Sequence, residues 1–187
     1  MKNRIQRAVR RPWVSVPALV GLAITIGPTQ AAAQTMHRSP HMEETANIAG
    51  VKGGLVNLFD NGERALGGNI SPFYERNVIP GWLELEAALA ITWIEDETVL
   101  AFELIAKKPF HVNPIVNPYV GLGPNASIIF APESRVTRFG ILAVAGSYFW
   151  FGHEHRWGFD FELVYLALFE SNLTHELTIE VGPGVRF

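Results

Sequence analysis

The sequence predicts an all-β protein whose fold is an eight-stranded antiparallel up-and-down β-barrel. Three observations lead to this fold class. Apolar residues alternate with polar or small residues along several segments, the chain beyond residue 46 has no long stretch of helical periodicity, and short turns join the segments. Short links require antiparallel pairing, and an even number of strands without covering helices closes most simply into a barrel.

Residues 1–33 have the three-part layout of a secretory signal peptide. A basic stretch ends at Arg11, an apolar run extends from Trp13 to Ile26, and small residues follow up to Ala33. The run is shorter than the roughly 20 residues that a membrane-spanning helix needs, which makes an uncleaved anchor the lesser alternative. We expect cleavage near Ala33, a flexible lead-in over residues 34–46 and a barrel over residues 47–187.

The composition excludes several classes of protein. The 187 residues include no cysteine, 48% are hydrophobic and 18% are charged, which is unlike a disordered chain or a small disulfide-rich domain. The formal net charge is -3, and residues 1–33 are basic without any acidic residue, so the remainder is clearly acidic. An acidic chain is a poor electrostatic partner for phosphates, and we expect no nucleic-acid partner.

Turn signals divide the chain beyond the lead-in into eight expected strands. The first two flank the turn from Asp60 to Glu63 and contain glycines, which mark bends or bulges in strands. The later strands are separated by turn-like runs rich in Asn, Pro, Gly and acidic residues. The expected strands cover residues 48–59, 65–75, 83–94, 98–110, 118–130, 136–151, 157–169 and 174–187.

Strand periodicity is clearest in the third, seventh and eighth segments. Between Leu83 and Trp93, and between Trp157 and Phe169, the odd positions are all apolar, which places one apolar face on each strand. The eighth segment alternates in the same way, although Pro183 cannot donate a ladder hydrogen bond, so we expect disturbed pairing there. Both faces of residues 136–151 are apolar, and their orientation stays open.

Alternation alone does not say whether the apolar face points into the barrel or out of it. An apolar interior would make a soluble, lipocalin-like barrel that binds an apolar ligand in the periplasm. An apolar exterior would make a transmembrane barrel with aromatic residues at both interfaces. Trp82 and Trp93 bracket one strand, and a strand of this length tilted by about 40° rises roughly 28 Å, which matches the height of a membrane-spanning apolar band.

The sequence resembles the small eight-stranded outer-membrane β-barrel proteins of Gram-negative bacteria. The resemblance depends on the alternating C-terminal segment 177–187 and on the turns within 78–86, 107–110 and 121–124, which look like those of one largely uncharacterised branch. It implies an outer-membrane location, contact with membrane lipid and lipopolysaccharide, and a monomer. It also implies that the barrel-assembly machinery recognises a terminal signal formed by Ile179, Val181, Val185 and Phe187.

The resemblance implies that both termini are periplasmic. The position of each charged residue along its strand then says how far it lies from the periplasmic end of the barrel. Several of them then fall in the periplasmic half of the lumen, namely Glu84, Glu86, Lys107, Asp160, Glu162 and Arg186, with Lys52 as a further candidate. Buried charges persist only when they are paired. We therefore expect a layer of ion pairs that plugs the lumen, and an ion path is the alternative.

No constellation in the sequence predicts catalysis, a metal centre or a cofactor. His153 and His155 have a minimal metal-ligand spacing, but no third ligand is identifiable. Ser171 and His175 could suggest a lipid A-modifying hydrolase, but their order and flanking residues do not fit. We therefore expect a structural or interaction role, with the lipocalin-like barrel and the lipid A hydrolase as alternatives.

Overall fold

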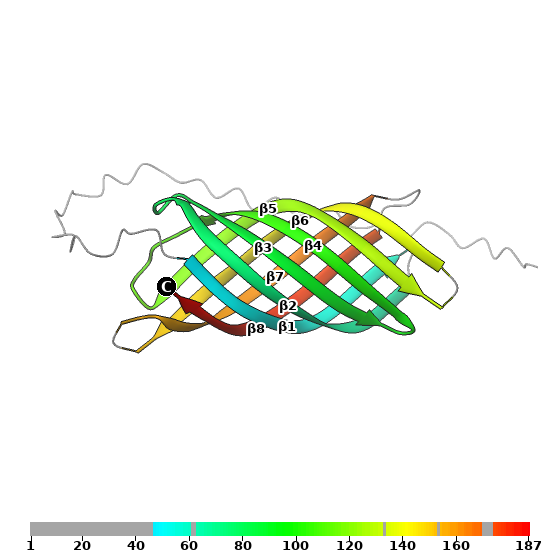
Figure 1. Ribbon diagram of the computed structural model, residues 1–187, viewed down its shortest axis with the longest axis horizontal. Coiled ribbons are helices and arrows are strands. Elements are labelled where there is room, and N and C mark those ends of the chain that lie inside the picture. Colours follow the sequence, from blue (N-terminus) through cyan, green and yellow to red (C-terminus); the bar gives the residue numbers. More distant parts are fainter. Residues whose placement is uncertain (1–46, 61–62, 133, 153, 170–173) are drawn as a thin grey trace, which may run out of the picture. The chain divides into compact units, whose positions relative to one another are not determined.

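The computed structural model describes residues 47–60, 63–132, 134–152, 154–169 and 174–187. Eight antiparallel strands, each hydrogen-bonded to its neighbours in sequence, form a closed barrel because β1 also pairs with β8 (Figure 1). The strands are β1 (Asn47–Asp60), β2 (Glu63–Ile79), β3 (Leu83–Ile94), β4 (Glu97–Pro109), β5 (Val116–Ala131), β6 (Ser134–Phe151), β7 (Trp157–Phe169) and β8 (Thr174–Arg186). The expected signal peptide, its cleavage site near Ala33 and the lead-in lie outside the described residues.

The number and order of the strands agree with the sequence prediction, and the second strand differs most in length. Strand β2 extends to Ile79 rather than ending at residue 75, because Arg76 and Asn77 still pair with β3 before the register shifts between Asn77 and Ile79. The turn that follows is closed by a hydrogen bond from the backbone N–H of Trp82 to the carbonyl of Ile79. Gly81 adopts φ +67 in this turn, a conformation that favours glycine.

The apolar faces of the strands point outward and the polar faces point into the barrel. Along β3, Leu85, Leu89 and Trp93 are exposed, whereas Glu86 and Thr92 are buried. Strands β7 and β8 repeat this arrangement with alternating exposed and buried positions. The distribution is the inverse of that in a soluble barrel, and it decides the orientation that alternation alone left open.

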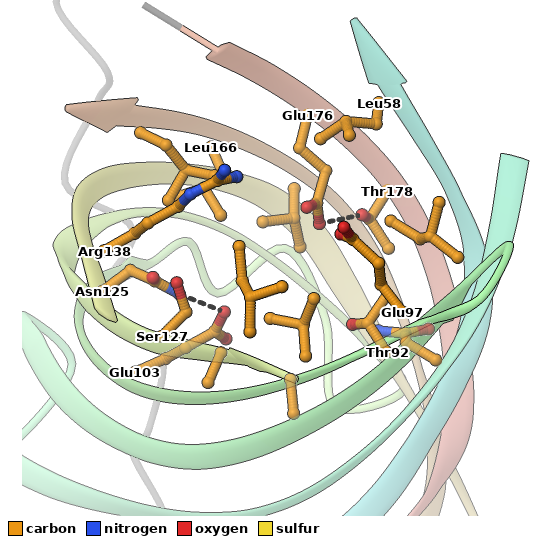
Figure 2. Close-up of a pocket in the computed structure, with 18 of the residues that line it drawn as sticks. Leu58, Thr92, Glu97, Glu103, Asn125, Ser127, Arg138, Leu166, Glu176 and Thr178 are labelled. Atoms are coloured by element: carbon orange, nitrogen blue, oxygen red, sulfur yellow. Dashed lines mark hydrogen bonds between the residues drawn. The ribbon is translucent and has the colours of Figure 1, made fainter. Parts of the chain in front are cut away.

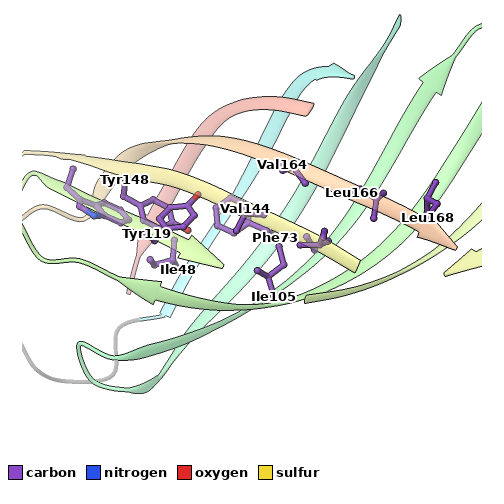
Figure 3. Close-up of a cluster of buried hydrophobic side chains, with 12 residues drawn as sticks. Ile48, Phe73, Ile105, Tyr119, Val144, Tyr148, Val164, Leu166 and Leu168 are labelled. Atoms are coloured by element: carbon purple, nitrogen blue, oxygen red, sulfur yellow. The ribbon is translucent and has the colours of Figure 1, made fainter. Parts of the chain in front are cut away.

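Strand β6, whose orientation the sequence left open, has its even positions inside. Gly140, Leu142, Val144 and Tyr148 are buried, and the intervening odd positions are mostly exposed. The apolar side chains of this inner face pack in a cluster of buried hydrophobic residues inside the barrel (Figure 3). The inward packing of these apolar residues explains why the alternation of β6 was ambiguous.

The seam between β1 and β8 is irregular at the position where Pro183 was expected to disturb pairing. Pro183 pairs with β7, but the pairing of β8 with β1 passes from Gly184 to Val181 and skips Val51 and Lys52. Beyond this gap the seam closes, since the backbone N–H groups of Asn47 and Phe187 each donate to the other residue's carbonyl at 2.9 Å. The irregularity is therefore confined to one side of β8.

The barrel has two ends with different connections. The terminal end holds the start of β1, the end of β8, the turns at residues 80–82 and 110–115, and the junction of β6 with β7. The hairpin end holds the ends of β1, β3, β5 and β7 and the starts of β2, β4, β6 and β8. Within the described ranges, no helix is long and apolar enough to cross a membrane.

Candidate functional site: the charged lumen

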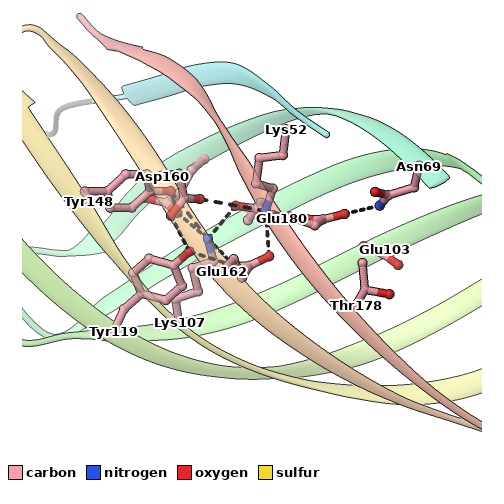
Figure 4. A network of polar contacts seen from close by, with 12 residues as sticks. Lys52, Asn69, Glu103, Lys107, Tyr119, Tyr148, Asp160, Glu162, Thr178 and Glu180 are labelled. Carbon is pink, nitrogen blue, oxygen red and sulfur yellow. Dashed lines mark hydrogen bonds and ion pairs between the residues drawn. The ribbon is translucent and has the colours of Figure 1, made fainter. Parts of the chain in front are cut away.

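Lys52 of β1 stands at the centre of a group of carboxylates inside the barrel (Figure 4). Its Nζ lies 2.6 Å from Glu162 Oε1 and 3.0 Å from Glu86 Oε1. Carboxylate oxygens of Glu180 and Asp160 are slightly farther away, at 3.7 and 3.8 Å. The lysine is only 1% exposed, so these carboxylates replace the water that an ammonium group normally binds.

Lys107 of β4 forms the second cationic centre, and it shares carboxylates with Lys52. Its Nζ lies 2.5 Å from Glu86 Oε2, 3.1 Å from Glu75 Oε2 and 3.3 Å from Glu162 Oε2. The same ammonium group lies 4.1 Å from the centroid of the Tyr119 ring, a cation–π distance. Because Glu86 and Glu162 bridge the two lysines, the ion pairs form one connected network.

Two tyrosines of neighbouring strands complete the network with hydroxyl groups. The Tyr119 hydroxyl lies 2.6 Å from Asp160 Oδ1 and 2.8 Å from Glu162 Oε2, and the Tyr148 hydroxyl donates to Glu75 Oε2 at 2.8 Å. The two ring centroids are 5.2 Å apart, and Tyr148 also stacks on Trp150 at 5.2 Å. The rings therefore lie next to the charged groups inside the barrel.

Gly146 of β6 packs against this network, and no larger residue fits at its position. A Cβ atom on Gly146 would lie 2.5 Å from the Tyr119 hydroxyl and 2.6 Å from the backbone oxygen of Phe161. These distances are shorter than any normal contact of a Cβ atom. The glycine therefore creates the space in which Tyr119 reaches Asp160 and Glu162.

The network contains most of the charged residues that the sequence placed in the lumen. Glu86, Lys107, Asp160 and Glu162 are buried and contact one another directly or through Lys52. Glu84 and Arg186 are half-buried, and the guanidinium of Arg186 lies 4.1 Å from the centroid of the Trp150 ring. The network also includes four residues that were not predicted from the sequence, namely Glu75, Glu180, Tyr119 and Tyr148. The inward parity of Glu75 and Glu180 was a signal for these two.

The other candidate groups from the sequence do not assemble into a reactive centre among the described residues. His153 and Ser171 lie outside these residues, and Glu154 forms an exposed ion pair with Arg156 at 2.9 Å. His175 lies on the outward side of β8, and its Nδ1 is 2.7 Å from the Tyr165 hydroxyl. No serine, cysteine or carboxylate is hydrogen-bonded to the imidazole of His175 within the described part of the chain.

One group of three carboxylates has the spacing of a metal site, but a lysine occupies its centre. Oxygen atoms of Glu86, Asp160 and Glu162 all lie within 4.8 Å of one another. The ammonium group of Lys52 lies within 3.8 Å of an oxygen atom of each. A metal ion would have to displace this ammonium group, so the three carboxylates serve as counter-ions of the lysine.

The residues of the expected assembly signal lie on the outer surface of β8 and just beyond it. Ile179 and Val181 are about half exposed on the outward face, and Phe187 is 63% exposed. Val185 is half-buried on the same face of the strand. Together they form an apolar stripe along the closing strand that faces away from the lumen.

A small cavity lies in the lumen on the hairpin side of the charged network (Figure 2). Its volume is about 40 Å³, which is room for water-sized species and not for a lipid chain. Its lining includes four glutamates, one arginine, and several amide and hydroxyl groups, namely Glu97, Glu103, Glu176, Glu180, Arg138, Asn69, Asn125, Thr92, Ser127 and Thr178. About half of the lining residues are apolar, among them Val164, Leu166 and Leu168, so the cavity in the hairpin half has a mixed polar and apolar lining.

The fold is similar to that of several solved structures. Neisserial surface protein A matches with a TM-score of 0.63 and 13% identity over 76% of this chain and 99% of that chain. The N-terminal β-barrel domain of Pseudomonas aeruginosa OprF matches with a TM-score of 0.56 and 18% identity over 78% and 98%. The outer membrane enzyme PagL matches with a TM-score of 0.53 and 11% identity over 73% and 97%.

No protein-family model matches the sequence, and no curated protein matches it either. At the identities of the structural matches, the likeness concerns the fold alone. The chain therefore has the closed eight-stranded fold of small outer-membrane β-barrels, a fold that a surface protein and an outer-membrane enzyme both adopt.

Proposed function

We propose that this protein is an integral outer-membrane β-barrel with a structural or interaction role and a lumen that its own side chains close. The observation that carries the proposal is the inverted burial of the strands. Side chains such as Leu55 and Leu66, both 74% exposed, cover the outside, whereas Lys52 and Lys107 are at most 1% exposed inside. Such a surface is stable only against an apolar solvent, and the lipid bilayer supplies one.

The distribution of aromatic side chains supports the membrane location. Exposed aromatic residues gather near both ends of the strands, with Trp82, Phe110, Phe151 and Trp157 near the terminal end and Trp93, Phe130, Phe139 and Phe169 near the hairpin end. Aromatic girdles of this kind lie at the two interfaces of transmembrane barrels. The strands have 12 to 18 residues, and about 9–11 are enough to cross a bilayer.

The filled lumen supports a structural or interaction role rather than transport. Trp150, Tyr119 and the two lysines are among the largest fully buried side chains of the protein. An apolar ligand of lipid size would not find enough space in a cavity of about 40 Å³, which charged side chains also line, and this argues against the lipocalin-like alternative. In the orientation we propose, the terminal end faces the periplasm and the hairpin end faces outward.

Envelope fractionation combined with gel migration tests this proposal. The protein is expected in the outer-membrane fraction, to be extracted only by detergent, and to migrate faster on a denaturing gel before boiling than after. A known soluble periplasmic protein from the same cells serves as the fractionation control. Recovery of the protein in the soluble periplasmic fraction, with no shift on boiling, would contradict the proposal and favour a soluble carrier.

The contact between His175 and Tyr165 supports a second candidate function, that of a lipid A-modifying hydrolase. The imidazole of His175 and the hydroxyl of Tyr165 are hydrogen-bonded on the outward face of the barrel, near the hairpin end, where a base could reach a lipid. The lipid A mass profile of cells that express the wild type, His175→Ala or Ser171→Ala discriminates between the candidates. An unchanged profile in all three strains is expected from a non-enzymatic barrel.

A further inference from the structure

The cavity in the hairpin half of the lumen contains oxygen atoms that no protein group satisfies. Asn125 Oδ1 and Ser127 Oγ belong to side chains that are 2% and 3% exposed, and neither atom has a hydrogen-bond partner among the described residues. Asn69 Oδ1 is unpartnered in the same way. All three residues line the cavity. Buried polar atoms without partners are rare in native proteins, so these oxygens indicate that the cavity holds water or an ion.

The amide groups next to these oxygens are oriented by carboxylates of the same cavity. The Nδ2 group of Asn125 donates to Glu103 Oε1 at 3.1 Å, and the Nδ2 group of Asn69 donates to Glu180 Oε1. Because each amide nitrogen donates to a carboxylate, the orientation of each amide is fixed, and its oxygen atom remains available to accept a hydrogen bond or to bind an ion. The side chains of Asn125, Ser127 and Glu103 lie together on one wall of the cavity (Figure 2).

The charge of the lining also favours a cation. Four glutamates line the cavity, and Arg138 is the one basic residue among the lining groups. Lys52, the nearest cation of the network, reaches Glu180 only at 3.7 Å and is shared with closer carboxylates. The lining therefore carries more negative than positive formal charge even when Arg138 is counted against it.

We propose that this cavity binds a hard divalent cation of the calcium or magnesium type. Carboxylate, amide and hydroxyl oxygens are the ligands that such cations prefer, and the lining has no histidine, cysteine or methionine that would favour a softer metal. The carboxylates of Glu103 and Glu180 and the side-chain oxygens of Asn69, Asn125 and Ser127 are the candidate ligands. The volume of about 40 Å³ admits one ion with a few water molecules.

The cavity extends from the edge of the lysine network, where Glu180 lies, toward the hairpin end. Glu97, which is exposed next to the β3–β4 hairpin, is one of the lining residues, so the cavity extends toward the outer rim. Glu180 is shared with Lys52 at 3.7 Å, whereas Glu86 and Glu162, the closest partners of the two lysines, do not line the cavity. The cation site is therefore distinct from the three-carboxylate group that holds Lys52, and it depends on different side chains.

The test is an unfolding measurement on purified, refolded full-length protein in a zwitterionic detergent without lipopolysaccharide. After treatment with a chelator, the protein is titrated with calcium or magnesium chloride, with sodium chloride at matched ionic strength as the salt control. Calcium or magnesium is expected to raise the unfolding temperature in a saturable manner at concentrations where sodium has no effect. Isothermal titration calorimetry of the same samples is expected to give about one site per chain.

The informative variant is Glu103→Gln, matched with Asp96→Asn at the same end of the barrel. Glu103→Gln keeps the shape of the side chain but removes one ligand charge, and it is expected to weaken divalent binding by about tenfold or more. Its unfolding temperature without divalent ions should equal or exceed that of the wild type, because a buried charge is lost. Asp96 is exposed and does not line the cavity, so Asp96→Asn should retain the full response.

Two results would overturn the proposal. One is a wild type whose unfolding temperature and binding heat do not respond to millimolar calcium or magnesium. The other is an equal response in the wild type, Glu103→Gln and Asp96→Asn, which would assign the effect to divalent ions on the protein surface. Both results leave the membrane location untouched, since that location is tested by fractionation.

Discussion

Two adjacent lysines of β4 show how the environment of a residue, rather than its type, decides what it contributes to stability. Lys107 points into the lumen and contacts three carboxylates, of which the nearest oxygen lies 2.5 Å away. Lys108 points outward, where its Nζ donates to the Gly81 carbonyl and lies 5.7 Å from the centroid of the Trp82 ring. The first lysine compensates buried negative charge, whereas the second makes only contacts at the surface.

We expect Lys107→Met to destabilise the folded barrel by about 3–5 kcal/mol, because the carboxylates that it leaves behind cannot be hydrated. Lys108→Met is the matched control and should cost less than about 1 kcal/mol. Equilibrium unfolding in urea, followed by tryptophan fluorescence of barrels in lipid vesicles, measures both values. Equal effects of the two substitutions would mean that the lumen admits enough water to solvate the carboxylates.

A single glycine in β6 tests how tightly the tyrosines are packed. We expect Gly146→Ala to destabilise the barrel by about 1–3 kcal/mol, because the new methyl group would overlap the Tyr119 hydroxyl and the Phe161 carbonyl. Gly53→Ala is the control, since its Cβ would lie 3.5 Å from the nearest backbone oxygen, an ordinary contact. Unfolding temperatures of the two variants should differ clearly, and equal values would show that Tyr119 moves without cost.

At the scale of the strands, period-two alternation predicted most of the fold. The residues of β3, β7 and β8 alternate so regularly that their faces followed from parity, and the turns between them set the strand bounds to within a few residues. Strand β6 could not be oriented because Leu142 and Trp150 make its inner face apolar as well. Which face of β6 points inward is determined by its pairing with β5 and β7, and this pairing depends on the folded barrel and not on the local sequence.

The same parity predicted part of the charged network but not its connectivity. Glu86, Asp160 and Glu162 were identified because they lie on the polar faces of regular strands. The contacts that matter join residues far apart in sequence, such as Lys52 and Glu162, and depend on how the barrel closes. The roles of Tyr119 and Tyr148 were missed because an aromatic residue in a strand fits either face, and the sequence alone does not say which.

The outward face of β3 allows a direct test of the membrane environment. Leu89 lies in the middle of the strand and is 42% exposed. In a bilayer, Leu89→Arg is expected to destabilise the barrel by about 2–4 kcal/mol, whereas Val78→Arg near the terminal end should cost about 0–1 kcal/mol. Refolding titrations in lipid vesicles measure both substitutions. Near-neutral effects at both positions would be the behaviour of a surface in contact with water.

At the scale of the whole barrel, the two halves of the lumen differ in what fills them. The terminal half contains the rings of Tyr119, Tyr148 and Trp150 together with the lysine network, and the largest fully buried side chains lie there. The hairpin half contains a cavity of about 40 Å³ that both polar and apolar side chains line. We therefore expect the barrier to ions in the terminal half, where the aromatic rings and the ion pairs lie.

This division predicts the electrical behaviour of the barrel. Wild-type protein in planar bilayers is expected to show no stepwise conductance. The double substitution Tyr148→Ala with Trp150→Ala removes two stacked rings from the lumen and should produce small, cation-preferring steps, because the remaining network has more carboxylates than ammonium groups. Phe149→Ala with Phe151→Ala, on the outward face of the same strand, is the control and should stay silent.

The gel shift of the unboiled protein first establishes that each variant has folded, so a silent recording cannot be confused with an unfolded chain. Steps in the wild type would contradict the closed lumen and favour an ion path through the lysine network. A folded double variant that stays silent would mean that the ion pairs alone close the cross-section. In that case Lys52 and Lys107, which hold five carboxylates around them, form the barrier, and the aromatic rings only support it.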